Sequence, residues 1–350
     1  MIETTSTAGE EAELAPAPTS SPRVTVVITT HNRPGLLRIA VASALQQTYQ
    51  DLHLIVLDDG SSVDPAEALA EIHDPRLTIV RNVVNAGITL TMRRGFSLGE
   101  SEYFMLFADD DVLHPEFVAK CVDALDAVPD AMAVTTRSVL IDAAGRPSGV
   151  PEGVDHPRPR QVVDGLGFAR LYFRQSPVCR MYIAAMMFRT SLMREHALEY
   201  PNEGFARCSD DLLLAEMAAV ATHVVVLPDR LYFRRFHATM NSAASPNVIS
   251  ELLLAAVVGA RLLTAAPAEI RNLFVRFVVQ SALQVTRDLP YPQASHGVRR
   301  IREALPDTGL TMRDVLSTWD WRRRVEFSSR LGLWAVRMSQ SMRLRRSAKA

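Results

Sequence analysis

Two clusters of acidic residues follow two separate apolar segments of the chain. Residues 58–61 read DDGS directly after LHLIVL, and residues 109–111 read DDD directly after YFMLFA. Either cluster alone is explained by a turn or a helix cap, but three adjacent carboxylates repel one another unless a cation or hydrogen-bond donors compensate. Carboxylate oxygens suit magnesium or manganese, which typically bind one or two carboxylates plus phosphate oxygens. Together the clusters predict a site for Mn2+ or Mg2+ and a diphosphate.

The segments around these clusters alternate between strand and helix patterns. Short β-branched runs predict strands, and apolar residues at helical spacing predict helices. Their alternation with short links predicts parallel strands with right-handed crossovers, a sheet covered on both faces, and ligands at the carboxyl ends of the strands. Both acidic clusters then fall on one edge of the sheet. The predicted strands are 24–29, 52–59, 77–81 and 103–111, and the predicted helices are 36–47, 65–73, 88–99 and 115–127.

The second half of the chain has a more mixed pattern. Residues 248–345 are predicted to be helical apart from a break around Asp288–Gly297, and residues 141–160, rich in proline and glycine, are predicted to be a long loop. The fold class is therefore α/β, with a mixed, mostly parallel sheet and a C-terminal helical region. Further strands are expected at 131–140, 182–188, 223–227 and 230–236, and further helices at 165–175 and 210–221.

Composition excludes several classes of protein. With 48% hydrophobic and 22% charged residues, the 350-residue chain has the mix of a soluble globular protein. A net charge of -1 gives no global field that would favour nucleic acid. Cys121, Cys179 and Cys208 form no CxxC pair, so we expect neither a disulfide framework nor a zinc site. The longest apolar candidate, 252–266, is too short and interrupted to span a membrane. A cytoplasmic location fits these features.

Several spaced motifs resemble a known enzyme family. VTVVITTHNRPGLLRIAVASALQQTYQDLHLIVLDDGSS and NAGITLTMRRGFSLGESEYFMLFADDDVLHPEFV resemble the nucleotide-binding half of family-2 inverting glycosyltransferases with a GT-A fold. The likeness runs from about Val24 to Phe117 and continues more weakly through PVCRMYIAAMMFRTSLM, CSDDLLLAEMA and LYFRRFHATMNS. It implies transfer of a sugar from a nucleotide diphosphate to an acceptor hydroxyl.

The resemblance and the composition together suggest three regions. Residues 1–21 lack large apolar side chains and are expected to be a disordered tail. Residues 22–245 would form the GT-A domain, divided into a nucleotide-binding half (22–128) and an acceptor half (129–245). Residues 246–350 would form the helical region.

The resemblance also assigns roles to individual residues of the donor site. One departure from the family pattern is Ala108, which stands where many relatives have the first Asp of an acidic metal motif. The implied contacts are Thr29 and Asp59 for the base and ribose, Arg93 (with Arg94 as the alternative) for the base or diphosphate, Asp109 near the ribose, Asp110 as the metal ligand, and His237 near the metal or diphosphate.

The acceptor hydroxyl is a poor nucleophile and needs a base. In relatives this role falls to an acidic pair that opens a helix, and Asp210-Asp211 before LLLAEMA resembles that pair. Asp211 is the first choice and Asp210 the second. In this interpretation the metal held by Asp110 neutralises the departing diphosphate, while the loop at 141–160 or one near 200–208 orders over the donor.

Two other functions compete with this interpretation. A sugar-phosphate nucleotidyltransferase would need a glycine-rich phosphate loop after the first strand, and TTHNRPGLL contains only Gly35. A non-catalytic sugar-nucleotide-binding or scaffold protein is favoured by Ala108 and opposed by the acidic residues Asp109, Asp110 and Asp211.

The acceptor is left open as a glycan, a lipid-linked molecule or a small molecule. Residues 322–350 carry nine basic side chains against Glu326 alone, and they include an apolar stripe at helical spacing from Phe327 to Met342. This pattern predicts either a last helix packed on the core or an interfacial helix that binds an anionic membrane peripherally.

Overall fold

The computed structural model describes residues 22–147, 159–173, 182–201, 209–236, 248–287 and 299–311. These residues belong to two compact units. The sheet unit comprises Met1–Gly165, Cys179–Ala206 and Ala221–Met240, and the helical unit comprises Leu166–Val178, Arg207–Val220 and Asn241–Ala350. The helical unit thus includes two segments that the sequence analysis assigns to the acceptor half.

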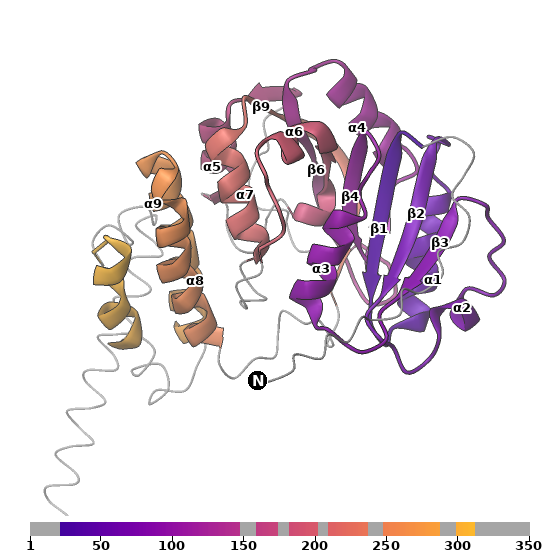
Figure 1. The fold of residues 1–350 in the computed structure, drawn as a ribbon, viewed down its shortest axis with the longest axis horizontal. Helices are drawn as coiled ribbons and strands as arrows, with labels where there is room; N and C mark the ends of the chain where they lie inside the picture. Colours follow the sequence, from indigo (N-terminus) through magenta and orange to yellow (C-terminus); the bar gives the residue numbers. More distant parts are fainter. Residues whose placement is uncertain are drawn as a thin grey trace, which may run out of the picture. The chain divides into compact units, whose positions relative to one another are not determined.

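The first four strands of the sheet unit are parallel, as the alternation predicts. Their order in the sheet is β3-β2-β1-β4 (Figure 1). Thr30 lies opposite Asp58 and Thr29 opposite Ala108, so the carboxyl ends of β1, β2 and β4 are level. Both acidic clusters therefore begin at one edge of the sheet. The strands are β1 (Val24–Thr30), β2 (Leu52–Asp58), β3 (Leu77–Arg81) and β4 (Tyr103–Ala108).

Helices cover both faces of this parallel part (Figure 1). Side chains alternate along β1: Val24, Val26 and Ile28 belong to one apolar cluster with α1 (Pro34–Leu45) and α4 (Phe117–Asp126). The opposite face meets α3 (Ile88–Ser97), where a Cβ on Gly95 would lie 3.3 Å from Val27 and 3.4 Å from Thr29. A short α2 (Pro65–Ala68) follows β2 and is capped by Asp64, which accepts from Ala66 N at 2.8 Å.

The second half of the sheet differs from the prediction in detail. One long strand, β9, replaces the two predicted at 223–227 and 230–236; its pairing with β6 shifts register around Pro228, which cannot donate to the ladder. The strand predicted at 103–111 ends at Ala108, so Asp109–Asp111 lie in a turn. β7 and α6 were not predicted, because each is too short for a clear periodicity. The elements are β5 (Val112–Leu113), β6 (Ala131–Ile141), β7 (Gln161–Val163), η1 (Ile183–Ala185), β8 (Met186–Arg189), α6 (Thr190–Glu195) and β9 (His223–Arg235).

β8 joins the two halves of the sheet. It pairs antiparallel with β4 on one side and with β6 on the other, while β5 and β7 pair antiparallel with β9. The sheet is therefore mixed: β1 to β4 are parallel to one another, β6 and β9 are also parallel, and the remaining pairs are antiparallel.

The helical unit packs around aromatic side chains. Phe173 lies 6.0 Å from Phe274 and 5.5 Å from Phe277, measured between ring centroids. A Cβ on Gly259 would lie 2.2 Å from the Phe274 ring, so α8 and α9 approach closely at that glycine. Within the described part of the chain, no helix is both long and apolar enough to cross a membrane. The main helices are α5 (Gly165–Phe173), α7 (Ser209–Val220), α8 (Val248–Leu262) and α9 (Ala268–Arg287), with short turns η3 (Leu263–Ala265) and η4 (Leu305–Thr308).

Candidate active site

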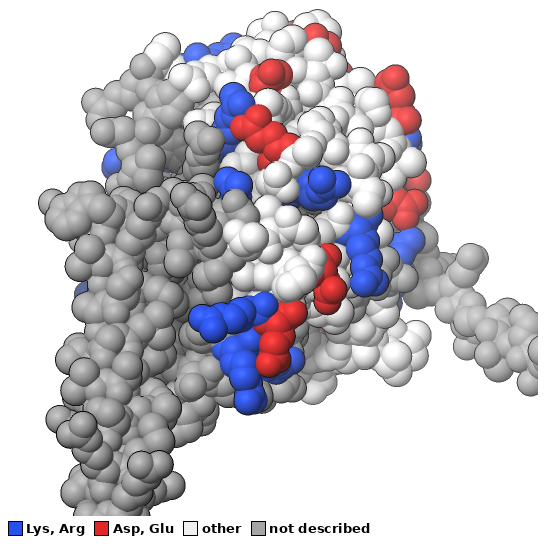
Figure 2. Space-filling model, turned by 90° about the vertical axis from the view of Figure 1, so that its left-hand side faces the viewer, with Lys and Arg blue, Asp and Glu red and all other residues white. Residues whose placement is uncertain are grey.

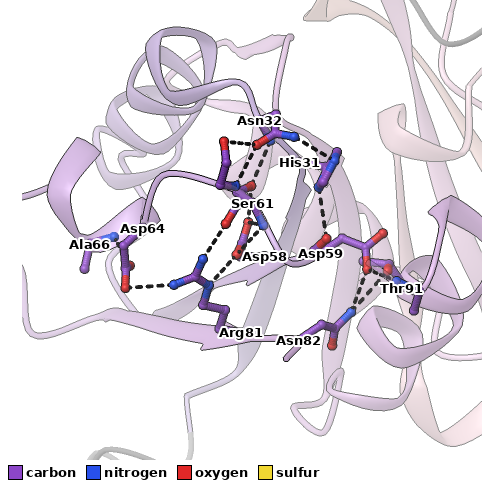
Figure 3. A network of polar contacts seen from close by, with 12 residues as sticks. His31, Asn32, Asp58, Asp59, Ser61, Asp64, Ala66, Arg81, Asn82 and Thr91 are labelled. Atoms are coloured by element: carbon purple, nitrogen blue, oxygen red, sulfur yellow. Dashed lines mark hydrogen bonds and ion pairs between the residues drawn. The ribbon is translucent and has the colours of Figure 1, made fainter. Parts of the chain in front are cut away.

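Asp58 stabilises the turn after β2. Its buried carboxylate accepts hydrogen bonds from Ser61 N at 3.1 Å, from the Ser61 hydroxyl and from Arg81 Nε at 3.0 Å (Figure 3). Arg81 also binds Asp64 at 3.1 Å and the Ser61 carbonyl. All these partners belong to the turn or to the neighbouring strand, so Asp58 has a structural role.

Asp59 points the other way and holds the loop that follows β3. Its carboxylate, 5% exposed, accepts from Asn82 Nδ2 at 2.9 Å, Ala86 N at 2.8 Å and Gly87 N at 3.0 Å (Figure 3). Burial by itself would raise the pKa of Asp59, but these hydrogen bonds outweigh it and lower the pKa below its ordinary value. Asp59 is therefore a fixed anionic acceptor at the carboxyl edge of the sheet.

Arg94, rather than Arg93, connects to Asp59. The guanidinium of Arg94 donates to Asn82 Oδ1, and Asn82 in turn donates to Asp59. Arg93 instead forms an ion pair with Glu199 at 2.9 Å. Both arginines line a pocket of about 560 Å³ between α3 and residues 190–200. The register given as the alternative in the sequence analysis is thus the one that reaches the Asp59 network.

His31, which the sequence analysis did not select, joins the loops after β1, β2 and β3. Its Nδ1 lies 2.9 Å from the Asp59 carbonyl oxygen, and its Nε2 lies 2.8 Å from Asn32 Nδ2 and 3.0 Å from Asn85 Nδ2. The Asn32 and Asn85 amides are oriented by backbone N–H groups of Ser62 and Gly87, which donate to their Oδ1 atoms. Both amides then donate to Nε2, and this assigns the neutral tautomer with the proton on Nδ1.

The acidic turn after β4 is held from the β1 side. Thr30 Oγ1 donates to Asp109 Oδ2 at 2.7 Å, and Arg33 Nη1 lies 3.0 Å from both Asp109 Oδ1 and Asp110 Oδ2. Burial raises the pKa of Asp109, while the contacts with Thr30 and Arg33 oppose that rise. The Thr30 carbonyl also accepts from Asp59 N at 2.9 Å, so this one residue links the two acidic clusters.

Thr29 lies deeper than its implied contact with the nucleotide suggests. Its side chain is buried beneath α3, where Oγ1 donates to Met92 Sδ at 3.4 Å. Thr30, one residue later, presents its hydroxyl to the acidic turn instead.

The third carboxylate, Asp111, turns inward towards the second half of the sheet. It accepts from the Tyr232 hydroxyl and from Arg235 N at 2.7 Å. Burial first, and then the nearby charge of Asp110, raise the pKa of Asp111 to about 7. Asp111 is therefore an anchor between the turn after β4 and β9, and Asp109 and Asp110 are the candidate ligands in this turn.

A divalent metal fits the chemistry of this pair. Asp109 and Asp110 supply hard oxygen ligands of the kind that magnesium and manganese prefer, and one nitrogen of Arg33 already bridges them. Among the described residues no group of three or more His, Cys, Asp or Glu could hold a metal. His237, the other predicted metal contact, lies outside the described residues. Further ligands would have to come from phosphate oxygens or from elsewhere.

Asp210 and Asp211 open α7 in the helical unit, and they differ in accessibility. Asp211 is 2% exposed and accepts from the Tyr172 hydroxyl at 2.8 Å, whereas Asp210 is half-buried. A carboxylate that accepts a proton from an acceptor hydroxyl must come within hydrogen-bond reach of it. Of the two carboxylates, Asp210 is the more accessible.

Comparison with known proteins identifies the sheet unit. The family model described as "Glycosyl transferase family 2" matches residues 25–189. Residues 25–189 of this chain form a glycosyl transferase family 2 domain. An uncharacterized glycosyltransferase of Haemophilus influenzae is 30% identical to this chain over 107 residues, which cover 30% of this chain and 33% of that protein. The chain spans about a third of the length of that protein and of Protein CgeD of Bacillus subtilis, another curated relative that it matches.

Solved structures share the fold of this chain. S. aureus TarS residues 1–349, crystallised with UDP-GlcNAc, superposes with a TM-score of 0.63 at 17% identity, covering 89% of this chain and 92% of that one. The mannosyltransferase PcManGT from Pyrobaculum calidifontis, in complex with GDP-Man and Mn2+, gives a TM-score of 0.50 at 19% identity over 87% of this chain and 88% of that one. These likenesses confirm the predicted GT-A type of fold.

Described basic and acidic side chains are interspersed on the face of the molecule that Figure 2 shows, with neither sign of charge prevailing. This matches the nearly neutral net charge. The stripe and basic residues of 322–350 lie outside the described residues, as do residues 148–158 of the predicted loop 141–160 and residues 202–208 of the predicted loop near 200–208.

Proposed function

We propose that this protein is an inverting, metal-dependent glycosyltransferase that uses a nucleotide-diphosphate sugar. The observation that carries the proposal is the meeting, at the carboxyl edge of β1, β2 and β4, of the Asp59 network with the Asp109–Asp110 pair. Thr30 contacts both through its carbonyl and its hydroxyl. An anionic hydrogen-bond acceptor beside a pair of metal-type ligands suits a nucleotide at one end and its diphosphate at the other.

The donor half of the reaction uses residues of the sheet unit. Asp59, oriented by Asn82, would accept a hydrogen bond from the base or ribose, and Arg94 would contact the base or diphosphate. Asp110, with Asp109 beside it, would hold Mn2+ or Mg2+. When bound, the metal supplies positive charge that stabilises the departing nucleotide diphosphate.

The acceptor half requires a base. We assign this role to Asp210, because Asp210 is half-buried whereas Asp211 is only 2% exposed. Asp210 accepts the proton of the acceptor hydroxyl as the oxygen attacks the anomeric carbon, and the bond from that carbon to the diphosphate breaks on the opposite side. A positioned carboxylate of this kind typically contributes about 10²–10⁴-fold to the rate.

Two structural neighbours suggest which donors to test first. TarS was crystallised in complex with UDP-GlcNAc, and PcManGT is described in complex with GDP-Man and Mn2+. The acceptor is proposed only as a class, a hydroxyl of a glycan, a lipid-linked molecule or a small molecule. Peripheral contact of residues 322–350 with an anionic membrane is a separate proposal from the sequence pattern.

The decisive experiment measures donor hydrolysis or transfer with UDP- and GDP-sugars at increasing Mn2+. We expect metal-dependent release of nucleotide diphosphate by the wild type and none by Asp110→Asn, with folding of the variant verified by circular dichroism. Full activity of the folded variant, at Mn2+ that just saturates the wild type, would overturn the assignment of Asp110.

A thermal-shift measurement beside the same donor assay distinguishes a catalytic protein from the non-catalytic alternative. A protein that only binds sugar nucleotides would be stabilised by UDP or GDP with Mn2+ in a thermal-shift measurement, since a ligand bound by the native state raises stability by mass action. It would nevertheless release no nucleotide from any donor sugar over long incubation.

A further inference from the structure

Arg33 is placed between the two carboxylates that we assign to the metal. It directly follows the loop after β1 and is the N-cap residue of α1. A single guanidinium nitrogen, Nη1, lies 3.0 Å from Asp109 Oδ1 and 3.0 Å from Asp110 Oδ2. The Arg33 side chain is only 19% exposed, and those of Asp109 and Asp110 are 6% and 14% exposed. These contacts are therefore partly shielded from solvent.

This arrangement neutralises part of the charge of the acidic turn. Adjacent carboxylates repel one another, and a nearby cation relieves that repulsion. The guanidinium is permanently protonated and donates in a planar fork. In the structure Arg33 Nη1 contacts one oxygen of each carboxylate, Asp109 Oδ1 and Asp110 Oδ2. A divalent ion held by the same two oxygens would compete with Arg33 for them.

We propose that Arg33 is a tethered counter-cation that makes tight metal binding conditional on the nucleotide. Metal binding without nucleotide displaces Arg33 from its two carboxylates and offers it no anion in return. When a nucleotide diphosphate is present, the displaced guanidinium pairs with phosphate oxygens, which it binds with strong charge-assisted hydrogen bonds. Arg33 thus couples the two ligands. The coupling is reciprocal, so the metal strengthens nucleotide binding by the same factor.

This inference rests on the proposed function, because it assumes that Asp109 and Asp110 hold the metal. It goes further in assigning Arg33 a positioning role that is exerted before any chemistry. Free enzyme would bind metal only weakly at the acidic turn, and the donor would strengthen that binding. Arg33 would then lie against the diphosphate when the donor is in place.

The test is a Mn2+ titration of the full-length protein, followed by the electron paramagnetic resonance signal of free Mn2+. It is done without nucleotide and with saturating UDP or, in a parallel arm, GDP, with correction for Mn2+ bound by nucleotide in solution. Without nucleotide, Arg33→Gln should bind Mn2+ about tenfold more tightly than the wild type. Nucleotide should tighten Mn2+ binding about tenfold or more in the wild type and much less in Arg33→Gln, within the range usual for coupled sites.

Two variants serve as controls. Arg33→Lys keeps a cation at the position and should bind nucleotide-free Mn2+ as weakly as the wild type. Arg38→Gln removes a positive charge from the same helix, where the side chain only donates to the Ala68 carbonyl at 3.1 Å, and should leave both titrations unchanged. If Arg38→Gln tightens Mn2+ binding as much as Arg33→Gln, the effect is general electrostatics and the proposal fails.

The outcomes distinguish this inference from the proposed function. Equal Mn2+ affinity of the wild type and Arg33→Gln without nucleotide, with Mn2+ binding abolished by Asp110→Asn, would overturn the role of Arg33 and leave the metal site intact. Absence of Mn2+ binding by the wild type and by Arg33→Gln, even with UDP or GDP, would overturn the metal-dependent function itself.

Discussion

The phenolic hydroxyl of Tyr232 donates a hydrogen bond to Asp111, although the two residues lie 121 positions apart in the sequence. Both side chains are buried, and Arg235 N donates to the other carboxylate oxygen at 2.7 Å. This contact fastens the acidic turn after β4 to β9. The position of Asp109 and Asp110 therefore depends on a strand from the second half of the sheet.

The raised pKa of Asp111 predicts a pH-dependent stability. The folded carboxyl has a pKa of about 7, above its ordinary value of 3.8, so the native state binds more protons than the unfolded state between these values. Stability from this group is therefore present at low pH and is lost as pH rises from about 4 to about 7. Asp111→Asn stays neutral and should remove that part of the pH dependence. Urea unfolding from pH 5 to pH 8 measures it.

The variant Tyr232→Phe tests the hydrogen bond to Asp111 separately from the charge of Asp111. Tyr232→Phe leaves the buried carboxylate without one donor and should lower the free energy of unfolding by about 1–3 kcal/mol. The loss should be larger at pH 8 than at pH 5, because the ionised form needs the donor more. An equal loss at both pH values would argue against ionisation of Asp111 in this range.

The two arginines of α3 give a matched pair for the nucleotide pocket. Arg94→Gln removes the guanidinium that binds Asn82, so we expect UDP or GDP affinity, measured calorimetrically, to fall about tenfold, as for loss of a charged hydrogen bond. Arg93→Gln breaks only a solvent-exposed pair with Glu199, and such pairs contribute about 0–1 kcal/mol to stability. If Arg93→Gln lowers nucleotide affinity more than Arg94→Gln does, Arg93 is the nucleotide contact, as the family resemblance first implied.

The sequence predicted the parallel half of the sheet well, for a local reason. Runs such as VTVVIT and LHLIVL are short, β-branched and bounded by turn residues, so both their type and their ends are visible in the sequence. The short α6 and β7 have too few residues to show a helical or strand periodicity in the sequence. The bulge at Pro228 in β9 was misinterpreted as a break between two strands, because proline usually interrupts a ladder.

The candidate site was predictable only in part, because its contacts are long-range. The acidic residues were found as clusters after strands. Their partners lie far away in the sequence: Thr30 is 79 positions from Asp109, and Arg33 is 76. The strand order places the ends of β1 and β4 side by side, which was predictable. Which side chains of the β1 loop turn towards the carboxylates is not recorded by any spacing in the sequence.

Gly60 should be required by the loop that Asp59 holds. Its φ is +69°, a conformation that disfavours residues with a Cβ, and a Cβ there would lie 2.7 Å from Asn85 N and 2.8 Å from Val84 C. Gly60→Ala should therefore cost at least about 1–2 kcal/mol from the left-handed backbone alone, and it should weaken nucleotide binding by pushing the loop from Asp59. Urea unfolding and UDP titration measure the two effects.

Gly35→Ala is the control for that substitution. Gly35 lies in α1 with no atom within 4 Å of an added Cβ. Alanine there should raise the free energy of unfolding by about 0.5–1 kcal/mol through helix propensity. If Gly60→Ala proved as harmless as Gly35→Ala, the loop could yield without strain and the tight approach to Asn85 would be unimportant.

The roles of Asp210 and Asp211 in α7 can be distinguished by comparing variants that remove a carboxylate charge with a variant that removes the hydrogen-bond donor Tyr172. Asp210→Asn should lower transfer by about 10²–10⁴-fold and leave nucleotide affinity unchanged, since a general base acts mainly in the transition state. Tyr172→Phe removes the buried hydrogen bond of 2.8 Å and Asp211→Asn replaces its charged acceptor with a neutral one, so both should lower the free energy of unfolding, by about 1–3 kcal/mol for Tyr172→Phe. Both should retain substantial turnover below their unfolding temperatures. If Asp211→Asn abolishes transfer while Tyr172→Phe, equally destabilised, retains it, then Asp211 is the base and its burial is relieved when the acceptor binds.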